Sequence, residues 1–100
     1  MSEFANFLKD LRLSSNYTQT QFAAKLGIDT AALSKIENGK KYLDPKVLPV
    51  ISKEFHKDLN SLKANYFGEK MAYELYSNNC PPKTLEILKK KFTFLKESLK

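Results

Sequence analysis

Apolar residues recur along this chain at spacings of three and four, which is the period of an amphipathic helix. The stripes predict helices over these ranges: 2–14, 18–26, 29–37, about 47–56, 58–67, 69–79 and 83–100. Pro49 would break the interior of a helix, so we expect it in the first turn of the fourth helix. Gly68 is the expected joint between the fifth and sixth helices. Only three glycines and four prolines interrupt the chain, which also favours an all-α fold.

The two helices predicted on either side of Gly27 have the clearest local signals. Thr18 and Gln21 are spaced for a capping box at the start of the first of these helices. Gly27 can end that helix with a positive φ, and Asp29 is a good N-cap for the helix that follows. The outer face of this following helix keeps small and polar residues: Thr30, Ala31, Ser34 and Lys35. A helix, a glycine-containing turn and a second helix with such a face are typical of a DNA-reading helix-turn-helix.

The segment TQTQFAAKLGIDTAALSKIENGK, residues 18–40, resembles the helix-turn-helix of the Cro/repressor (XRE-type) family of transcriptional regulators. The similarity includes the terminal IENGK, continues upstream to Arg12 and downstream through DPKVLPVISKEF, and covers roughly the first two-thirds of the chain. It implies an all-α, repressor-like five-helix helix-turn-helix domain with one or two additional C-terminal helices. Residues 1–67 are the expected DNA-binding region, and residues 68–100 are the expected C-terminal extension and dimerisation element, both within a single compact domain.

A structural pair is also implied by the resemblance. In this family a basic residue at the position of Arg12 pairs with the glutamate of the IENG motif, here Glu37. Arg12 has an alternative role as a phosphate contact, and the pair is the favoured interpretation. A planar guanidinium can hold the end of the third helix against the first.

If the third predicted helix, residues 29–37, enters the major groove of B-form DNA, its outer face meets the base edges. Lys35 can donate to guanine O6 and N7. Thr30 and Ser34 can donate or accept, and Ala31 can pack on a thymine methyl group. These side chains are short, so we also expect readout of DNA shape. The positions expected to contact phosphates, several of them from the resemblance, are Thr18, Gln19, Asn38, Lys40, Lys41 and Lys46.

The last predicted helix has two apolar faces, counting about 100° per residue. Its main seam consists of Leu85, Leu88, Phe92, Leu95 and Leu99. Ile87 and Phe94 fall on a separate face. One face can be buried on the chain's own body, so the second suggests a partner, and a homodimer through Leu88, Phe92, Leu95 and Leu99 is predicted. The alternative is that a small domain tolerates one or two exposed apolar residues.

The net charge of +6 indicates a polyanionic partner. The resemblance implies that this partner is double-stranded DNA. Most of the excess lies at the C-terminus, because residues 83–100 carry six basic and two acidic side chains. The run Lys89–Lys91 is either a DNA contact or a solvated face. In the family, dimers place two reading helices in major grooves about 34 Å apart, on a pseudo-palindromic operator. Phage repressors and the controller proteins of restriction–modification systems are the similar regulators.

Several classes of function lack the residues they need. The single histidine, His56, and the single cysteine, Cys80, share no metal-ligand spacing with Asp58, so no metal or other cofactor is expected. The chain has no catalytic constellation, and we expect no enzyme activity and no small-molecule effector. No apolar run spans a membrane and MSEFANFLKD is no signal peptide, which with the lone cysteine predicts a cytoplasmic protein.

One alternative function stays open at this point. Small helix-turn-helix proteins can act as antitoxins, whose C-terminal segment binds a protein partner while the N-terminal part binds DNA. A C-terminus that folds stably in the isolated chain would argue against that function. A segment that becomes ordered only with a partner would argue for it.

Overall fold

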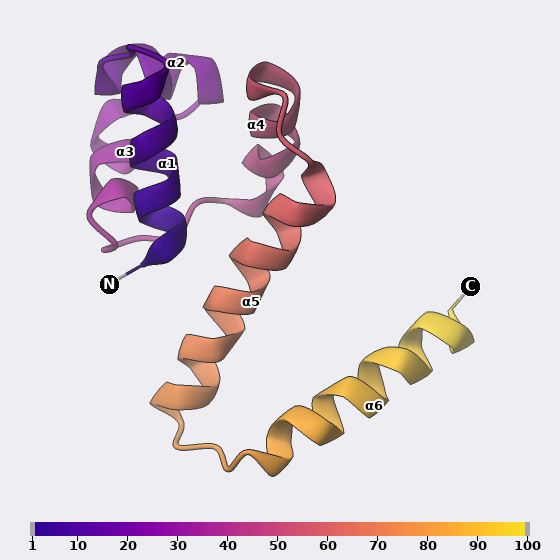
Figure 1. Cartoon of the computed structure of the whole chain (residues 1–100). Helices are drawn as coiled ribbons and strands as arrows, with labels where there is room; N and C mark the ends of the chain where they lie inside the picture. Colours follow the sequence, from indigo (N-terminus) through magenta and orange to yellow (C-terminus); the bar gives the residue numbers. More distant parts are fainter. Residues whose placement is uncertain (1, 100) are drawn as a thin grey trace. The chain divides into compact units, whose positions relative to one another are not determined.

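Six α-helices and one short 3-10 helix make up the structure, a computed structural model that describes residues 2–99 (Figure 1). In chain order they are α1 (Glu3–Ser14), α2 (Gln19–Leu26), α3 (Thr30–Glu37), η1 (Pro45–Val47), α4 (Leu48–Phe55), α5 (Leu59–Ser77) and α6 (Lys83–Ser98). No residue in this described range forms a strand. The predicted all-α fold is therefore confirmed, with five helices and one further C-terminal helix.

The first helix begins at Ser2, whose hydroxyl accepts from the backbone N–H of Ala5 at 3.0 Å. The same hydroxyl donates to the carboxylate of Glu69, which belongs to α5, at 2.7 Å. The Glu69 carboxylate also accepts from the backbone N–H groups of Glu3 at 2.6 Å and Phe4 at 3.1 Å. A negative charge thus lies at the positive end of the α1 dipole and ties α1 to α5.

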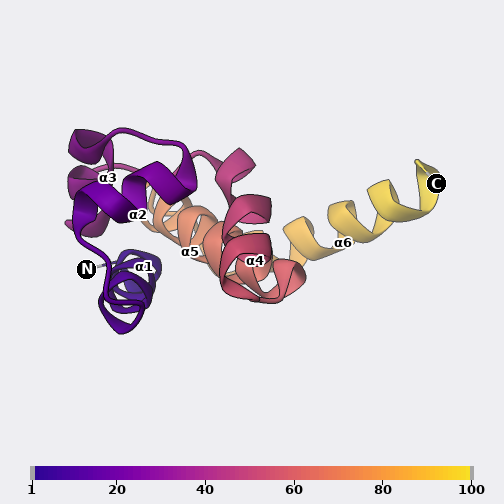
Figure 2. The ribbon, with the colours of Figure 1, turned by 90° about the horizontal axis from the view of Figure 1, so that it is seen from above.

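The hydrophobic core lies within the first of two compact units, Met1–Lys70, where α1 to α4 and the first part of α5 meet. α2 and α3 lie side by side in both views of the ribbon (Figures 1 and 2). Pro49 lies in the first turn of α4, where the missing N–H needs no partner. The buried cluster consists of Phe4, Leu8, Leu11, Phe22, Ala23, Leu26, Leu33, Ile36, Leu43, Val47, Leu48, Ile51, Leu62 and Tyr66.

The expected joint at Gly68 is wrong, because α5 runs without a break from Leu59 to Ser77 and replaces the predicted fifth and sixth helices. Gly68 does not have a positive φ, and a Cβ atom added there would meet nothing within 4 Å. A glycine inside a helix costs only about 1 kcal/mol. Tyr66 is buried and Glu69 is hydrogen-bonded to the start of α1, so tertiary contacts on either side of Gly68 favour the continuous helix.

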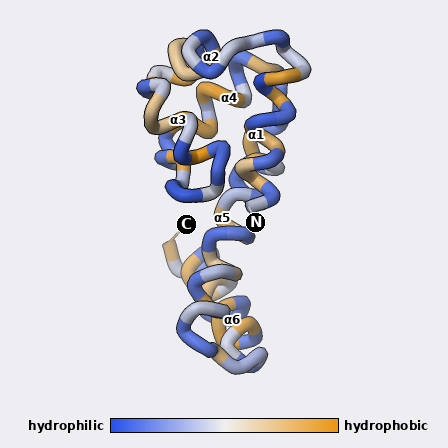
Figure 3. Tube along the Cα trace, turned by 90° about the vertical axis from the view of Figure 1, so that its left-hand side faces the viewer, coloured by the Kyte–Doolittle hydropathy of each residue, from blue (hydrophilic) through white to orange (hydrophobic). Residues whose placement is uncertain are grey.

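The second unit, Met71–Lys100, contains the end of α5 and all of α6. Pro81 and Pro82 separate the two helices, as the sequence predicts. None of the described residues 71–99 is buried. Both hydrophobic and hydrophilic residues occur in α6 (Figure 3). α6 ends at Ser98, and Lys100, the predicted end of this helix, lies outside the described residues.

Candidate nucleic-acid interface

The turn between α2 and α3 is built by the residues that the sequence pattern indicates. The Thr18 hydroxyl accepts from the N–H of Gln21 at 3.1 Å, and the Gln21 side-chain oxygen accepts from the N–H of Thr18 at 2.9 Å. Gly27 ends α2 with a φ of 74°. The Asp29 carboxylate then accepts from the N–H of Ala32 at 2.6 Å and starts α3. These caps fix the angle at which α3 leaves the turn.

The inner and outer faces of α3 differ sharply in burial. Leu33 and Ile36 face the core, with exposed fractions of 0% and 4%. Three of the four candidate base-reading residues, Thr30, Ala31 and Lys35, are exposed, while Ser34 is only half-buried. The structure therefore leaves the outer face of α3 open to a ligand, with Ser34 at its edge.

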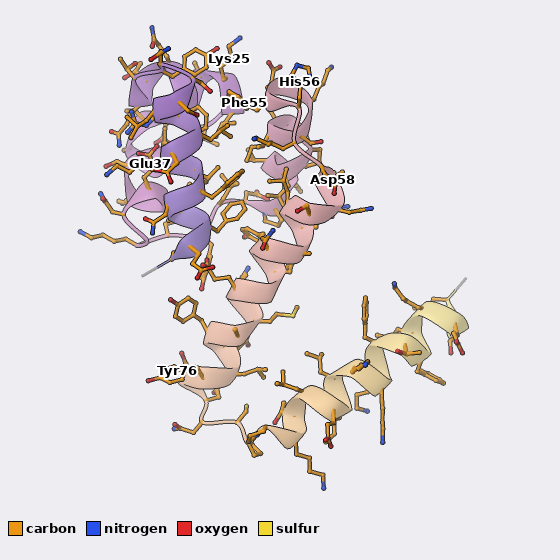
Figure 4. The ribbon with its side chains drawn as sticks, in the orientation of Figure 1. Lys25, Glu37, Phe55, His56, Asp58 and Tyr76 are labelled. Carbon is orange, nitrogen blue, oxygen red and sulfur yellow. The ribbon has the colours of Figure 1, made fainter. Side chains whose placement is uncertain are left out.

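Glu37, at the end of α3, joins three helices through its buried carboxylate (Figure 4). The side chain of Arg12 donates to it through Nε at 2.8 Å and through Nη2 at 3.0 Å. A third donor is the side-chain amide of Gln19, in α2, at 3.2 Å. Arg12 also donates through Nη1 to the carbonyl of Tyr17 at 3.1 Å. Because the pair is bidentate and largely shielded from water, it orients α3 relative to α1 and α2.

The structure changes the roles expected of two residues in α2, Gln19 and Thr20. One N–H of the Gln19 amide is used on Glu37, so a phosphate contact by this half-buried side chain has to use the other N–H or the backbone. The hydroxyl of Thr20 lies 3.5 Å from that of Thr30, so α2 adds an exposed polar side chain beside the start of α3. Sequence reasoning missed Thr20 because the contact depends on how α2 packs on α3.

The loop after α3 carries basic side chains and is fixed at its far end. Lys40 and Lys41 are exposed, and so is Lys46 in η1. Leu43, between these lysines, is buried, and its carbonyl accepts a hydrogen bond from the hydroxyl of Tyr66. Tyr66 belongs to α5, so the core holds the loop in place while its lysines remain in water.

The environment of Tyr66 also changes its titration. Burial raises the pKa of the Tyr66 phenol above its ordinary value of about 10, with smaller contributions from Asp44 and Tyr42. The Lys70 ammonium lies 5.4 Å from the centre of the Tyr42 ring and 5.9 Å from that of Tyr66. The contacts of α5 with the loop thus continue as far as Lys70.

Two further predicted phosphate contacts, Thr18 and Asn38, are exposed, and so are the residues predicted to form the dimer seam. Thr18, already used in its cap, and Asn38, at the end of α3, are exposed. The exposed fractions of the dimer candidates are 44% for Leu88, 57% for Phe92, 50% for Leu95 and 77% for Leu99. The side chains of Lys89–Lys91 are exposed as well.

Among residues 2–99, no group of three or more His, Cys, Asp or Glu side chains is placed to hold a metal ion. His56 ends α4 with a φ of 53°, and Asp58 accepts from the N–H of Ser61 at 2.8 Å (Figure 4). Cys80 is exposed beyond the end of α5. Within the same part of the chain, no helix is both long and apolar enough to cross a bilayer.

Comparison with known proteins shows that α2, α3 and the turn between them lie within a recognised domain. Residues 8–62 match the family model described as helix-turn-helix. A curated relative, the HTH-type transcriptional activator BcrR of Enterococcus faecalis, is 40% identical over 60 residues, which are 60% of this chain and 29% of that protein. The chain thus spans less than a third of the length of the relative it matches. No solved structure matches the chain significantly.

Proposed function

The chain belongs to the helix-turn-helix family, of the Cro/repressor (XRE) type that its sequence resembles, and on that basis we propose that it is a DNA-binding transcription regulator. The observation that carries the proposal is the outer face of α3. Thr30, Ala31 and Lys35 are exposed there, on a helix whose other face is buried. A helix so presented has the diameter of the B-DNA major groove.

In this proposal α3 reads bases, and the residues around it bind phosphates. Lys35 donates to guanine O6 and N7, and Thr30 and Ala31 meet bases at the start of the helix. Lys40, Lys41 and Lys46 supply charge for the backbone, together with Thr18, Gln19 and Asn38. The ion pair between Arg12 and Glu37 keeps α3 in one orientation, so that α3 loses little conformational freedom when it binds DNA.

We further propose that the regulator acts as a homodimer on a pseudo-palindromic operator. A single α3 covers only a few base pairs, and two copies related by a two-fold axis double the contact. The exposed seam of α6, with Leu88, Phe92, Leu95 and Leu99, is the proposed interface. The role is that of a phage-type repressor or of a restriction–modification controller. Protein concentration would then set activity through dimerisation.

The experiment that tests this function is selection of bound sequences from random duplex DNA at two salt concentrations. We expect enrichment of an inverted repeat whose half-sites lie about one helical turn apart. Enrichment should persist at the higher salt, although total binding falls. Binding that is general, salt-sensitive and without enrichment would refute sequence-specific regulation by the isolated chain.

A matched pair of lysine variants assigns the base-reading role. Lys35→Ala should lower affinity for the selected operator by about tenfold, because a good base contact provides about 1–3 kcal/mol of discrimination, and random DNA should lose less. Lys63→Ala removes the same charge from the exposed surface of α5 and should lower both affinities only slightly. Equal losses on operator and random DNA with Lys35→Ala would exclude it as a base reader.

The second candidate function is the antitoxin-like interaction module, in which the C-terminal segment binds another protein. The observation that favours it is the lack of any buried residue in 71–99. Leu95→Glu separates the two candidates. In the homodimer it should produce monomers in sedimentation and weaken operator binding, whereas in the interaction module it should leave the mass and operator binding unchanged.

A further inference from the structure

The exposed apolar seam of α6 is bordered by positive charge on both sides. If Leu85, Phe92 and Leu99 are heptad a positions, Leu88 and Leu95 are d positions. Positions e and g, which flank the seam, then hold lysine or small polar residues, and the lysines are Lys89, Lys91 and Lys96. The Lys96 ammonium lies over the ring of Phe92, 5.0 Å from its centre, so it directly borders the seam.

The two glutamates of α6 do not offset this charge. At about 100° per residue, Glu86 and Glu97 fall on the side of the helix opposite the seam. The surface that covers the seam therefore meets lysines and no carboxylates from α6. All of these side chains are exposed.

Simple pairing of α6 with a second α6 brings like charges together. In a parallel pair, g positions face e positions, so Lys91 of one copy faces Lys96 of the other. In an antiparallel pair e positions face each other, and Lys89 faces Lys96 of the second copy. Like charges across a helix pair are destabilising, so the pattern favours an acidic surface as the partner of α6.

The same chain carries such a surface on its first unit. Two adjoining hollows, of about 350 and 550 Å³, lie along α1 and the first part of α5. Phe4, Phe7 and Leu11 give them an apolar lining. Their charged lining residues are four carboxylates and one lysine: Glu3, Asp10, Asp58, Glu69 and Lys57. We call this surface the acidic face.

The acidic face is similar to α6 in length and opposite to it in charge. The seam from Leu85 to Leu99 rises about 21 Å, and α1, with 12 residues, is about 18 Å long. Three lysines, Lys89, Lys91 and Lys96, and no carboxylate of α6 border the seam, so it presents three positive charges. The lining of the acidic face has an excess of three negative charges.

We propose that α6 of one chain docks on the acidic face of a second copy, and that two copies exchange their α6 helices reciprocally. This inference rests on the proposed homodimer and states what the α6 seam contacts in it. The seam packs on Phe7 and its neighbours, and Lys89, Lys91 and Lys96 lie near Glu3 and Asp10. Because the exchange is two-fold symmetric, every contact occurs twice in the dimer.

The salt dependence of dimerisation tests the sign of the charges in the interface. Sedimentation of the unmodified chain should show a dissociation constant that rises about tenfold between about 50 mM and about 500 mM salt, because opposite charges are screened. Pairing of lysine-bordered seams predicts the reverse, a dimer that tightens as salt rises. A constant that falls or stays unchanged would overturn the proposal.

Charge reversal on each surface tests the partners. Asp10→Lys and Lys96→Glu should each raise the dissociation constant about tenfold or more, since each reversed contact occurs twice. Two matched controls, Glu54→Lys on α4 and Lys90→Glu on the far side of α6, should change it by about twofold or less. Asp10 is exposed in the last half of α1, where lysine is a good helix former, and circular dichroism checks that the variant folds.

Mixing the two variants decides whether the contact is between copies. In the mixed dimer one chain carries Asp10→Lys and the other carries Lys96→Glu, so one of the two contacts joins the substituted positions with both charges reversed and still opposite. The second contact joins Asp10 and Lys96, as in the unmodified dimer. The mixture should therefore dimerise within about threefold of the unmodified chain. A mixture as weak as its components would mean that α6 docks on its own chain, and would overturn the exchange.

The remaining outcomes separate this inference from the homodimer on which it rests. If the unmodified chain is a dimer that Leu95→Glu disrupts but Asp10→Lys does not, the homodimer stands and the acidic face is not its partner. If the unmodified chain sediments as a monomer at every concentration, both are refuted. DNA selection remains an independent test of regulation in either case.

Discussion

The two units of this molecule contain similar helices but bury very different amounts of them. Every buried residue among 2–99 lies at or before Tyr66, and residues 71–99 have none. α6 is as clearly amphipathic as α1, yet α1 has four buried residues. An isolated helix of 16 residues is only marginally stable in water. An apolar stripe therefore tells us that a helix needs a covering surface, but not which surface covers it.

The largest predicted difference in unfolding free energy is between alanine variants of two leucines, one buried and one exposed. Leu48→Ala, at a position with 0% exposure, should lower the free energy of unfolding by about 2–5 kcal/mol through lost burial and a cavity. Leu88→Ala, at 44% exposure, should cost about 0.5 kcal/mol or less at low protein concentration. Urea denaturation followed by circular dichroism measures both.

Protein concentration provides a control for these two leucine variants. The cost of Leu88→Ala should grow as the concentration rises, because dimers bury the seam, whereas the cost of Leu48→Ala should stay constant. A Leu88→Ala variant that is strongly destabilised at the lowest concentration would show that the second unit has a core of its own.

The next effect concerns the buried ion pair between Arg12 and Glu37 in the first unit. Arg12→Met should lower the free energy of unfolding by about 3 kcal/mol, because it leaves the Glu37 carboxylate buried without its main partner. The double variant Arg12→Met, Glu37→Met is the control and should recover most of that loss, since no buried charge remains. Thermal and urea unfolding at neutral pH measure both. Additive losses in the double variant would show that the two side chains stabilise the fold independently.

Local signals in the sequence predict most of the helices and turns of the first unit. The caps at Thr18 and Asp29, the turn at Gly27 and the inward residues of α3 follow from short-range rules about caps, φ and periodicity. Contacts between distant residues were not accessible in this way. Glu69 reaches the start of α1 across 67 positions of the chain. By local rules Gly68 suggests a joint, yet its cost inside a helix is only about 1 kcal/mol, and the contacts of Tyr66 and Glu69 on either side favour a continuous helix.

Smaller losses of unfolding free energy, measured at two positions of α5, should show where the first unit ends. Glu69→Ala removes the acceptor of three hydrogen bonds at the start of α1 and should cost about 1–2 kcal/mol. Glu74→Ala, in the same helix but in the second unit, is the matched control and should stay within about 0.5 kcal/mol. Denaturant unfolding compares them. Equal losses would mean that the cooperative unit extends beyond Lys70.

The weakest effect uses the titration of Tyr66, the last buried residue of the first unit. Tyr66→Phe removes the hydrogen bond to the Leu43 carbonyl and should cost about 1 kcal/mol at neutral pH. Burial raises the pKa of this phenol in the folded chain, so the unfolded chain releases the proton first as the pH passes about 10. The stability due to Tyr66 is complete below that pH and is lost as the pH rises through the folded value. The difference in unfolding free energy between the two proteins should therefore shrink above about pH 10, and a difference that stays constant would show that the core does not exclude the ionised phenol.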